Sequence, residues 1–280
     1  MNEPNQKPPE NPEEKLKIYF LPNLLTAGNL FCGFVALTTI VDADPYSEHY
    51  FDQIKVALAF ILLACIFDLL DGRVARMGGV ESPFGREFDS LADLISFGVA
   101  PAFLVQRVVL ADVFRHQQIS WFIASIYLLC GAFRLARFNC LAMMGGSSSK
   151  DFLGFPIPSA AGLVASLTLL IMHFSTNGKT LELWMDYVIA AVLLFLSAMM
   201  VSTVRYPSFK SLGLRSTNTF MKAIGVAIFI GALFIFKDKI LYYVLPAFFT
   251  LYLVYGFVRP SLSRAWRREI EEEDEEHEAH

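Results

Sequence analysis

Residues 68–93 read DLLDGRVARMGGVESPFGREFDSLAD and hold eight polar or small residues at fixed spacing inside a largely membrane-like chain. Its small and charged residues follow the spacing D-x2-D-G-x2-A-R-x8-G-x3-D-x3-D. The positions are Asp68, Asp71, Gly72, Ala75, Arg76, Gly85, Asp89 and Asp93. The chain around them is strongly apolar, and a charge at the centre of a membrane helix costs about 2.5–3.5 kcal/mol. The four carboxylates therefore need compensation, and a divalent cation is the simplest candidate.

The apolar residues predict a membrane protein. The chain has 280 residues, of which 55% are hydrophobic, and its mean hydropathy is +0.47. These residues come in blocks of about 20, the length of a helix that crosses a bilayer. We predict an all-α polytopic membrane protein, a bundle of about eight transmembrane helices. We do not expect it to bind nucleic acid. The predicted spans are residues 21–41, 53–71, 88–109, 118–137, 156–174, 184–203, 218–236 and 241–258.

The predicted spans form one transmembrane domain, residues 19–260, between two polar tails. Residues 1–18 are polar and Pro-rich, and residues 261–280 are charged and mostly acidic. We expect both tails to be solvated, and the first to be disordered. Residues 138–155, rich in Gly and Ser, and residues 204–217 are expected to be loops between spans.

The basic residues predict the orientation of the chain in the membrane. If the N-terminus is cytoplasmic, 17 of the 23 Lys and Arg residues fall in cytoplasmic segments and 6 outside. The positive-inside rule then places both termini and the aspartates on the cytoplasmic side of a cell or inner membrane. The four cysteines include no C-x2-C pair, so neither a zinc site nor a disulfide framework is expected.

The spacing of the aspartates places them on two helix faces. Asp68 and Asp71 are three residues apart near the end of the second span, so they share a face. Asp89 and Asp93 are four apart at the start of the third span and share another. If the two spans form a hairpin, all four carboxylates converge on one point. Ligation by oxygen alone suits Mg²⁺ or Mn²⁺ rather than zinc.

The other motif residues suggest a phosphorylated substrate. Gly72, Ala75 and Gly85 lack bulk, so a ligand or a second helix can approach the backbone closely. Arg76 lies one helical turn beyond Gly72 and suits a phosphate oxygen. We expect a diphosphate-bearing substrate at the membrane surface, and phosphoryl transfer as the reaction class.

Two other interpretations of the carboxylates remain open. In the first, they only pair with Arg73, Arg76 and Arg86 in a salt-bridged hairpin. Pairing alone does not require small residues at these spacings. In the second, the protein is a divalent-cation transporter, since intramembrane carboxylates also carry ions. Their position at helix ends rather than in mid-span argues against a permeation path.

The eight-residue motif resembles that of the CDP-alcohol phosphotransferase family of membrane enzymes. The resemblance implies transfer of a phosphatidyl or similar group from a CDP-linked donor to an alcohol, with CMP leaving. It also implies a six-helix catalytic core followed by two C-terminal helices, and a homodimer. Asp68, Asp71 and Asp89 would bind the metal. Asp93 would complete the metal site or act as general base, and the two roles remain open. Gly72, Ala75, Arg76 and Gly85 would line the CDP site.

Segments outside the motif narrow the acceptor alcohol. They read LPNLLTAGNLFCGF at 21–34, GAFRLARFN at 131–139, GFPIPSAAG at 154–162 and STVRYPSFK at 202–210. Together they are similar to the integral-membrane phosphatidylserine synthases of bacteria and archaea within that family. The similarity implies CDP-diacylglycerol and L-serine as substrates. Glycerol 3-phosphate or an inositol compound is the alternative acceptor.

Five polar residues in these segments are further candidates. Asn23 and Thr26 share a face at the start of the first span, where they either bind the nucleotide or cap the helix. Arg134 and Arg137 share a face at the end of the fourth span. They either hold a diphosphate or the serine carboxylate, or only provide the positive-inside signal. Asn139 is expected to assist them.

Overall fold

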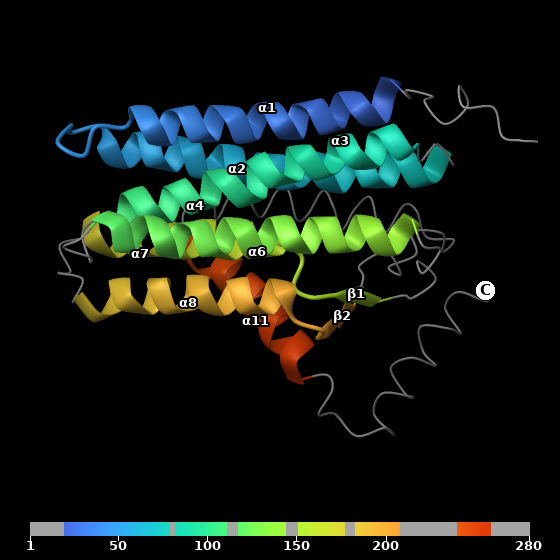
Figure 1. Cartoon of the computed structure of the whole chain (residues 1–280). Helices are drawn as coiled ribbons and strands as arrows, with labels where there is room; N and C mark the ends of the chain where they lie inside the picture. Colours follow the sequence, from blue (N-terminus) through green and yellow to red (C-terminus); the bar gives the residue numbers. More distant parts are fainter. Residues whose placement is uncertain are drawn as a thin grey trace, which may run out of the picture.

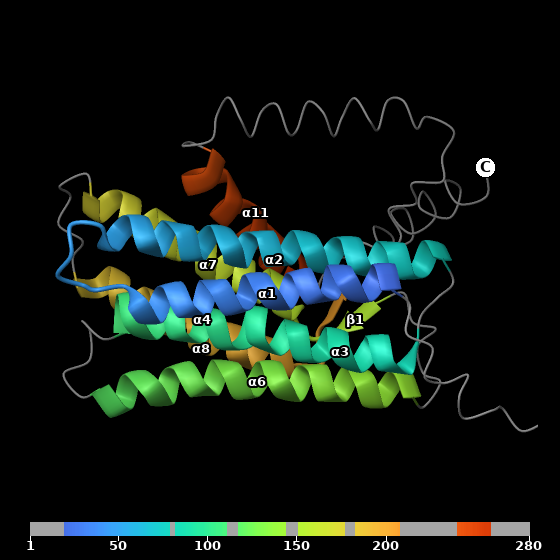
Figure 2. The same ribbon diagram turned by 90° about the horizontal axis from the view of Figure 1, so that it is seen from above.

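A computed structural model describes residues 20–78, 82–110, 117–143, 151–176, 183–207 and 240–258. It is a bundle of long helices, most of which run along a common direction (Figures 1 and 2). The α-helices are α1 (Phe20–Asp42), α2 (Tyr50–Gly78), α3 (Pro83–Asp93), α4 (Ala100–Val105), α6 (Gln117–Met143), α7 (Ile157–Thr176), α8 (Leu183–Val201) and α11 (Leu245–Val258). The π-helical segments η2 (Leu94–Val99), η3 (Gln106–Leu110) and η5 (Ile240–Val244) adjoin these helices.

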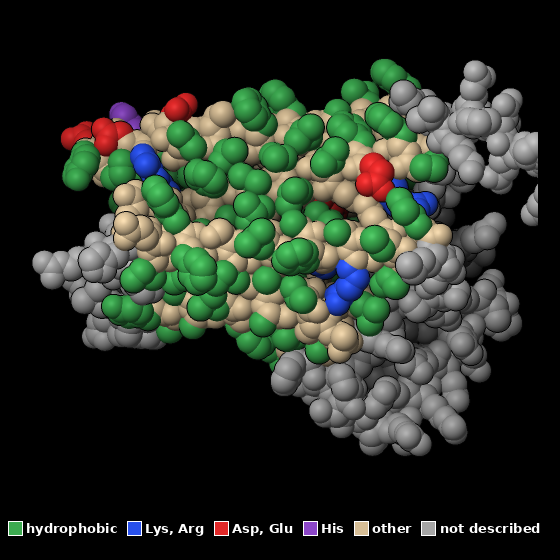
Figure 3. Space-filling model, in the orientation of Figure 1, with side chains coloured by type: hydrophobic (Ala, Val, Ile, Leu, Met, Phe, Trp, Pro, Cys, Tyr) green, Lys and Arg blue, Asp and Glu red, His purple; other side chains and the backbone are tan. Residues whose placement is uncertain are grey.

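The helices confirm the prediction of an all-helical multi-pass membrane protein. Among the described residues, five segments are long and apolar enough to cross a membrane. One of them runs from Pro83 to Leu110 through α3, η2, α4 and η3. Their outward faces carry many exposed apolar side chains, which cover much of the surface (Figure 3). Two shorter apolar helices, Tyr187–Val201 and Tyr242–Gly256, follow. The predicted span 218–236 lies outside the described residues, so the count of eight spans stays a prediction.

Small residues let α1 pack closely on its neighbours. It lies along α2 over much of its length and also contacts α3, η2 and α4. A Cβ atom at Gly28 would lie 3.1 Å from the ring of Phe67 on α2. A Cβ at Gly33 would collide with Oγ of Ser96 on η2 and would lie 2.7 Å from the Cα of Ser96, closer than a side chain tolerates. Glycine at position 33 is therefore needed for this crossing.

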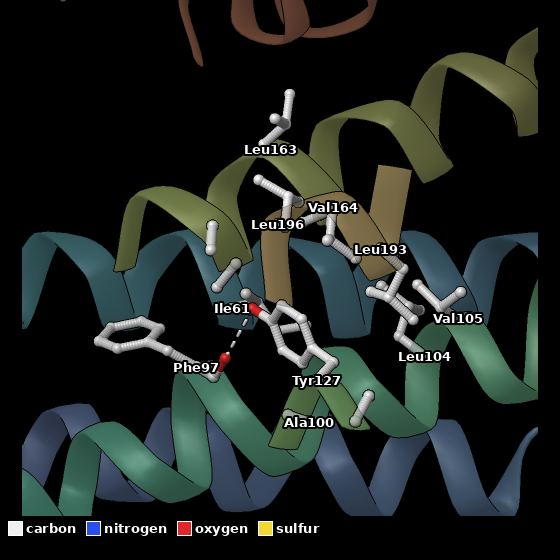
Figure 4. Close-up of a cluster of buried hydrophobic side chains, with 14 of the residues drawn as sticks. Ile61, Phe97, Ala100, Leu104, Val105, Tyr127, Leu163, Val164, Leu193 and Leu196 are labelled. Atoms are coloured by element: carbon white, nitrogen blue, oxygen red, sulfur yellow. Dashed lines mark hydrogen bonds between the residues drawn. The ribbon is translucent and has the colours of Figure 1, made fainter. Parts of the chain in front are cut away.

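The hydrophobic core lies where α2, η2, α4, α6, α7 and α8 meet (Figure 4). Leu104, Leu163 and Leu193 are almost completely buried in it. The one polar group of Tyr127 is satisfied there, because its hydroxyl donates to the backbone oxygen of Phe97 at 3.0 Å. This core fixes how the carboxylate-bearing helices sit against the rest of the bundle.

The start of α3 is specified locally. Ser82 has an extended backbone, and its hydroxyl accepts a hydrogen bond from the Gly85 amide at 3.0 Å. Pro83 follows at the first helical position, where its missing N–H costs nothing. The cap and the proline together begin the helix before Asp89, so both Asp89 and Asp93 are helical as expected.

Two short strands pair within the otherwise helical bundle. Strand β1 (Asp151–Leu153) pairs antiparallel with β2 (Arg205–Pro207), with Phe152 opposite Tyr206. The segments were expected to lie in loops. They pair because backbone groups that leave a helix near the bundle interior need hydrogen-bond partners.

The side chain of Tyr206 on β2 is buried against α11. Its burial, and to a lesser degree its interaction with Tyr252, raises the pKa of the phenol to about 12. The phenol therefore stays neutral, and its hydroxyl donates to Leu253 O at 3.4 Å.

The helix α6 also extends beyond its prediction. It continues to Met143, whereas the span was predicted to end at residue 137 and a loop to begin at 138. Arg134, Arg137 and Asn139 consequently all lie on one helix. Both predicted tails, residues 1–18 and 261–280, lie outside the described residues.

Candidate metal and substrate site

Three carboxylates from two helices meet at one point of the bundle. Asp68 and Asp71 lie on α2 and Asp89 on α3, and one oxygen atom of each lies within 4.8 Å of the other two. Asp71 is buried, and the other two are half-buried. Carboxylates this close repel one another strongly away from bulk water. The arrangement therefore favours a bound cation.

The donor set fits a hard divalent cation. All three groups offer oxygen, the ligand that Mg²⁺ and Mn²⁺ prefer. One oxygen, Asp89 Oδ1, is buried and has no hydrogen-bond partner among the described residues, although burial of an unsatisfied carboxylate oxygen is costly. The expected meeting of the two halves of the motif is thus observed. Metal binding itself stays a prediction.

Asp93 lies beside this group of three rather than within it. It is one helical turn beyond Asp89 and only 7% exposed. Its Oδ1 accepts a hydrogen bond from Asn29 Nδ2 at 3.1 Å, and its carboxyl group interacts electrostatically with Asp68 and Arg134. Of the four carboxylates that the sequence predicts to converge, three therefore meet within 4.8 Å, and Asp93 adjoins them. Its roles as base or fourth ligand remain predictions.

Helix α1 turns a polar stripe toward the carboxylates. Thr26 Oγ1 donates to Asp71 Oδ2 at 2.9 Å, across the contact between α1 and α2. A Cβ atom at Gly85 would lie 3.3 Å from Asn23 Oδ1, which places Asn23 against the first turn of α3. Asn23 Nδ2 is buried and has no partner among the described residues. Asn23 and Thr26 therefore both lie beside the motif. The bond of Thr26 joins two helices, so it is not a helix cap.

Asn29 is not among the site residues predicted from the sequence. It is completely buried and bonds directly to Asp93. The signal that could have found it is periodicity: Asn23, Thr26 and Asn29 are three apart, and three polar residues on one face of an apolar span are uncommon.

Arg134 and Arg137, the two arginines of α6, lie in different surroundings. Arg134 is 8% exposed and interacts electrostatically with Asp93 and Asp68. Its Nε is buried without a hydrogen-bond partner among the described residues. A buried guanidinium group with a free donor beside the carboxylates is able to receive an anionic substrate group.

Arg137 instead binds backbone oxygens. Its guanidinium group donates to Val201 O at 2.9 Å, Leu153 O at 3.0 Å, Ser202 O at 3.1 Å and Met200 O at 3.4 Å. These contacts tie α6 to the end of α8 and to β1. The observed hydrogen bonds of Arg137 all go to backbone oxygens of the protein itself. Binding of a substrate anion by Arg137 therefore stays a prediction.

Asn139 connects α6 to α3. Its Nδ2 donates to Ser90 Oγ at 3.0 Å and to Glu87 Oε2 at 3.3 Å. Ser90 neighbours Asp89, so this contact fixes the turn of α3 that presents one of the three carboxylates. Asn139 is among the residues predicted from the sequence, but its partners Ser90 and Glu87 are not.

The remaining motif residues flank the carboxylates along the chain. Gly72 and Ala75 are half-buried on α2, and Gly85 is half-buried in the first turn of α3. The side chain of Arg76 lies outside the described part of the structure. Binding of CDP by these residues stays a prediction.

The chain is similar in sequence to known proteins. Residues 19–204 match the family described as CDP-alcohol phosphatidyltransferase. The chain is 35% identical over 244 residues to the CDP-diacylglycerol–serine O-phosphatidyltransferase of Helicobacter pylori, covering 86% of this chain and 91% of that protein. It is 36% identical over 195 residues to the archaetidylserine synthase of Methanothermobacter thermautotrophicus, covering 69% and 72%. It is 32% identical over 191 residues to the CDP-diacylglycerol–serine O-phosphatidyltransferase of Bacillus subtilis, covering 68% and 92%.

Proposed function

Because the chain belongs to the CDP-alcohol phosphatidyltransferase family, we propose that it transfers the phosphatidyl group of CDP-diacylglycerol to L-serine. The products are phosphatidylserine and CMP. The observation that carries the proposal is the meeting of Asp68, Asp71 and Asp89 within 4.8 Å, with Asp93 one turn further along α3. Two of these relatives, which align with this chain over 244 and 191 residues, are named for serine as the acceptor.

The reaction is a substitution at phosphorus. The serine hydroxyl oxygen forms a bond to the phosphorus that bears the diacylglycerol. The bond from this phosphorus to the bridging oxygen breaks, and its electron pair leaves with CMP. Asp93 takes the hydroxyl proton, a role suited to a buried carboxylate next to the group of three. A divalent cation, Mg²⁺ or Mn²⁺, held by Asp68, Asp71 and Asp89, would neutralise charge on the diphosphate.

The surrounding residues hold the two substrates. Arg134 pairs with the serine carboxylate, because its free donor is buried beside Asp93. Asn23 contacts the nucleotide through its unpartnered amide nitrogen, on the side of the first turn of α3. Gly72, Ala75, Arg76 and Gly85 line the CDP site. The active site faces the cytoplasm, the acyl chains lie in the adjoining leaflet, and the enzyme is a homodimer.

A panel of acceptors tests the reaction. Purified protein in detergent micelles receives CDP-diacylglycerol, Mn²⁺ or Mg²⁺, and labelled serine, glycerol 3-phosphate or inositol in turn. We expect labelled lipid and CMP from serine alone, and no product after the metal is removed with EDTA. Product from another alcohol only would overturn serine as the acceptor. Release of CMP in detergent, where no transmembrane gradient exists, also separates an enzyme from a cation transporter.

A further inference from the structure

The buried side-chain amide of Asn29 on α1 bonds to Asp93, the residue that we propose accepts the proton. Asn29 is 0% exposed, and its Nδ2 donates to Asp93 Oδ1 at 3.1 Å. An ionised carboxylate only accepts hydrogen bonds, so the amide nitrogen must face Asp93 and the amide oxygen must face away. That contact is therefore directional and fixes one oxygen of Asp93.

The other side of the same amide is unsatisfied. Asn29 Oδ1 is buried without a hydrogen-bond partner among the described residues. Burying a polar atom without a partner destabilises a fold, and an apolar residue of similar size would fill the position at lower cost. Packing therefore does not explain an asparagine here, whereas its bond to Asp93 does.

The backbone of Asn29 is held in place by a second contact. Ser96 Oγ on η2 donates to Asn29 O at 2.9 Å, and Ser96 is completely buried. The hydroxyl reaches this carbonyl because Gly33, one turn further along α1, leaves the space for it. Asp93 is the last residue of α3, and η2 begins at the next residue. The wide π-helical turn thus carries Ser96 back to α1 close to the carboxylate.

We propose that Asn29 is a positioning residue: held by Ser96 in the space beside Gly33, it fixes the orientation of the Asp93 carboxylate toward the attacking hydroxyl. The inference rests on the proposed role of Asp93. It assigns Asn29 to catalysis through Asp93 and not to the group Asp68, Asp71 and Asp89. Loss of this bond should lower turnover and leave metal affinity unchanged.

Three variants and one control test the proposal in the full-length protein in detergent. Asn29→Ala removes the amide, and Asn29→Asp keeps its shape but removes the donor. Ser96→Ala removes only the hydroxyl that holds Asn29. Gln53→Leu is the control, because Gln53 Oε1 is also buried without a partner among the described residues but lies four helical turns from Asp68 on α2. For each, kcat, the KM values of both substrates, thermal stability and the Kd of Mn²⁺ by electron paramagnetic resonance are measured.

We expect kcat to fall about 100-fold in both Asn29 variants, because a misplaced catalytic group costs about that much. Ser96→Ala should lower it about tenfold, and Gln53→Leu should leave it unchanged. The KM values and the Kd of Mn²⁺ should stay within about threefold, since substrate and metal groups are left in place. A kcat of Asn29→Ala within about threefold of the parent would overturn the proposal.

A loss of Mn²⁺ affinity that matches the loss of kcat would overturn it as well, because Asn29 would then act through the metal site. The measurements use whichever alcohol supports CMP release in the acceptor panel. A wrong acceptor therefore defeats the proposed substrate alone and leaves the test of Asn29 intact. The Mn²⁺ titration requires no acceptor.

Discussion

The hydroxyl of Thr26 lies 2.9 Å from Oδ2 of Asp71, and this bond joins the first helix of the chain to the carboxylates of the second. Asp71 lies in the group of three carboxylates whose oxygens meet within 4.8 Å. A hydrogen bond to a metal-ligating carboxylate fixes its orientation and tunes its affinity. The relationship makes α1 part of the candidate metal site, although α1 contributes no carboxylate to it.

Replacing Thr26 should weaken the metal site without destroying it. Thr26→Val keeps the shape of the side chain and removes the bond to Asp71, so we expect Mn²⁺ to bind about tenfold more weakly. Thr26→Ser should bind it nearly as well as the parent, because the hydroxyl remains. Thr38→Val is the matched control, since within the described part of the chain the hydroxyl of Thr38 bonds only to backbone oxygens of its own helix. Unchanged Mn²⁺ affinity in Thr26→Val would contradict the role.

Replacing Asp89 should abolish turnover. Asp89→Asn removes a charge from the group of three at nearly constant volume, and a direct ligand matters more than its neighbours, so turnover should fall more than about 100-fold. Binding of Mn²⁺ by electron paramagnetic resonance should fall with it, while the elution volume in detergent stays the same. Asp52→Asn is the control, because Asp52 is exposed and pairs with Lys55 elsewhere on α2. An active Asp89→Asn protein would exclude Asp89 as a ligand.

Arg134 should control the affinity for the acceptor. Arg134→Lys keeps the charge near Asp93 but loses the planar fork that binds a carboxylate with two hydrogen bonds. We expect the KM of serine to rise about tenfold, as the loss of one bond to a charged group implies, while the KM of CDP-diacylglycerol stays the same. Steady-state kinetics with each substrate varied in turn make the comparison. A rise in the KM of CDP-diacylglycerol alone would assign Arg134 to the diphosphate instead.

Arg137 should control stability. Its guanidinium group bonds to four backbone oxygens at the end of α8 and at β1, so Arg137→Met should cost about 2 kcal/mol or more. The midpoint of thermal unfolding in detergent should fall accordingly. Arg107→Met is the matched control and should lower it less, because Arg107 donates to one backbone oxygen, Ala43 O. A rise in the KM of serine with an unchanged midpoint would place Arg137 in the acceptor site after all.

Local patterns explain why much of the site could be predicted. The spacing of Asp68 and Asp71, and of Asp89 and Asp93, follows the helical repeat, so each pair shares a face whatever the rest of the chain does. Ser82 and Pro83 fix the start of α3 within a few residues. Blocks of apolar residues predicted the described membrane helices, because backbone groups in a bilayer must be satisfied within a helix.

Contacts between distant residues could not be predicted in this way. The bond between Asn29 and Asp93 spans 64 residues, and that between Arg137 and Val201 also spans 64. Arg134 and Arg137 are three apart, which predicted a shared role, yet long side chains on one face of a helix still reach different neighbours. The pairing of β1 with β2 has the same cause, because three-residue strands carry no periodic signal of their own.

The sequence by itself determined the helices, the faces on which the carboxylates lie, and the family to which the chain belongs, because each depends on residue types at short, regular spacing. Only the tertiary structure decided which groups meet. It brought Asp68, Asp71 and Asp89 together, set Asp93 beside them on the amide of Asn29, and turned Arg134 and Arg137 to different surroundings. The physical reason is that helix packing, set by small residues such as Gly33 and by the buried core, places side chains that no local pattern relates.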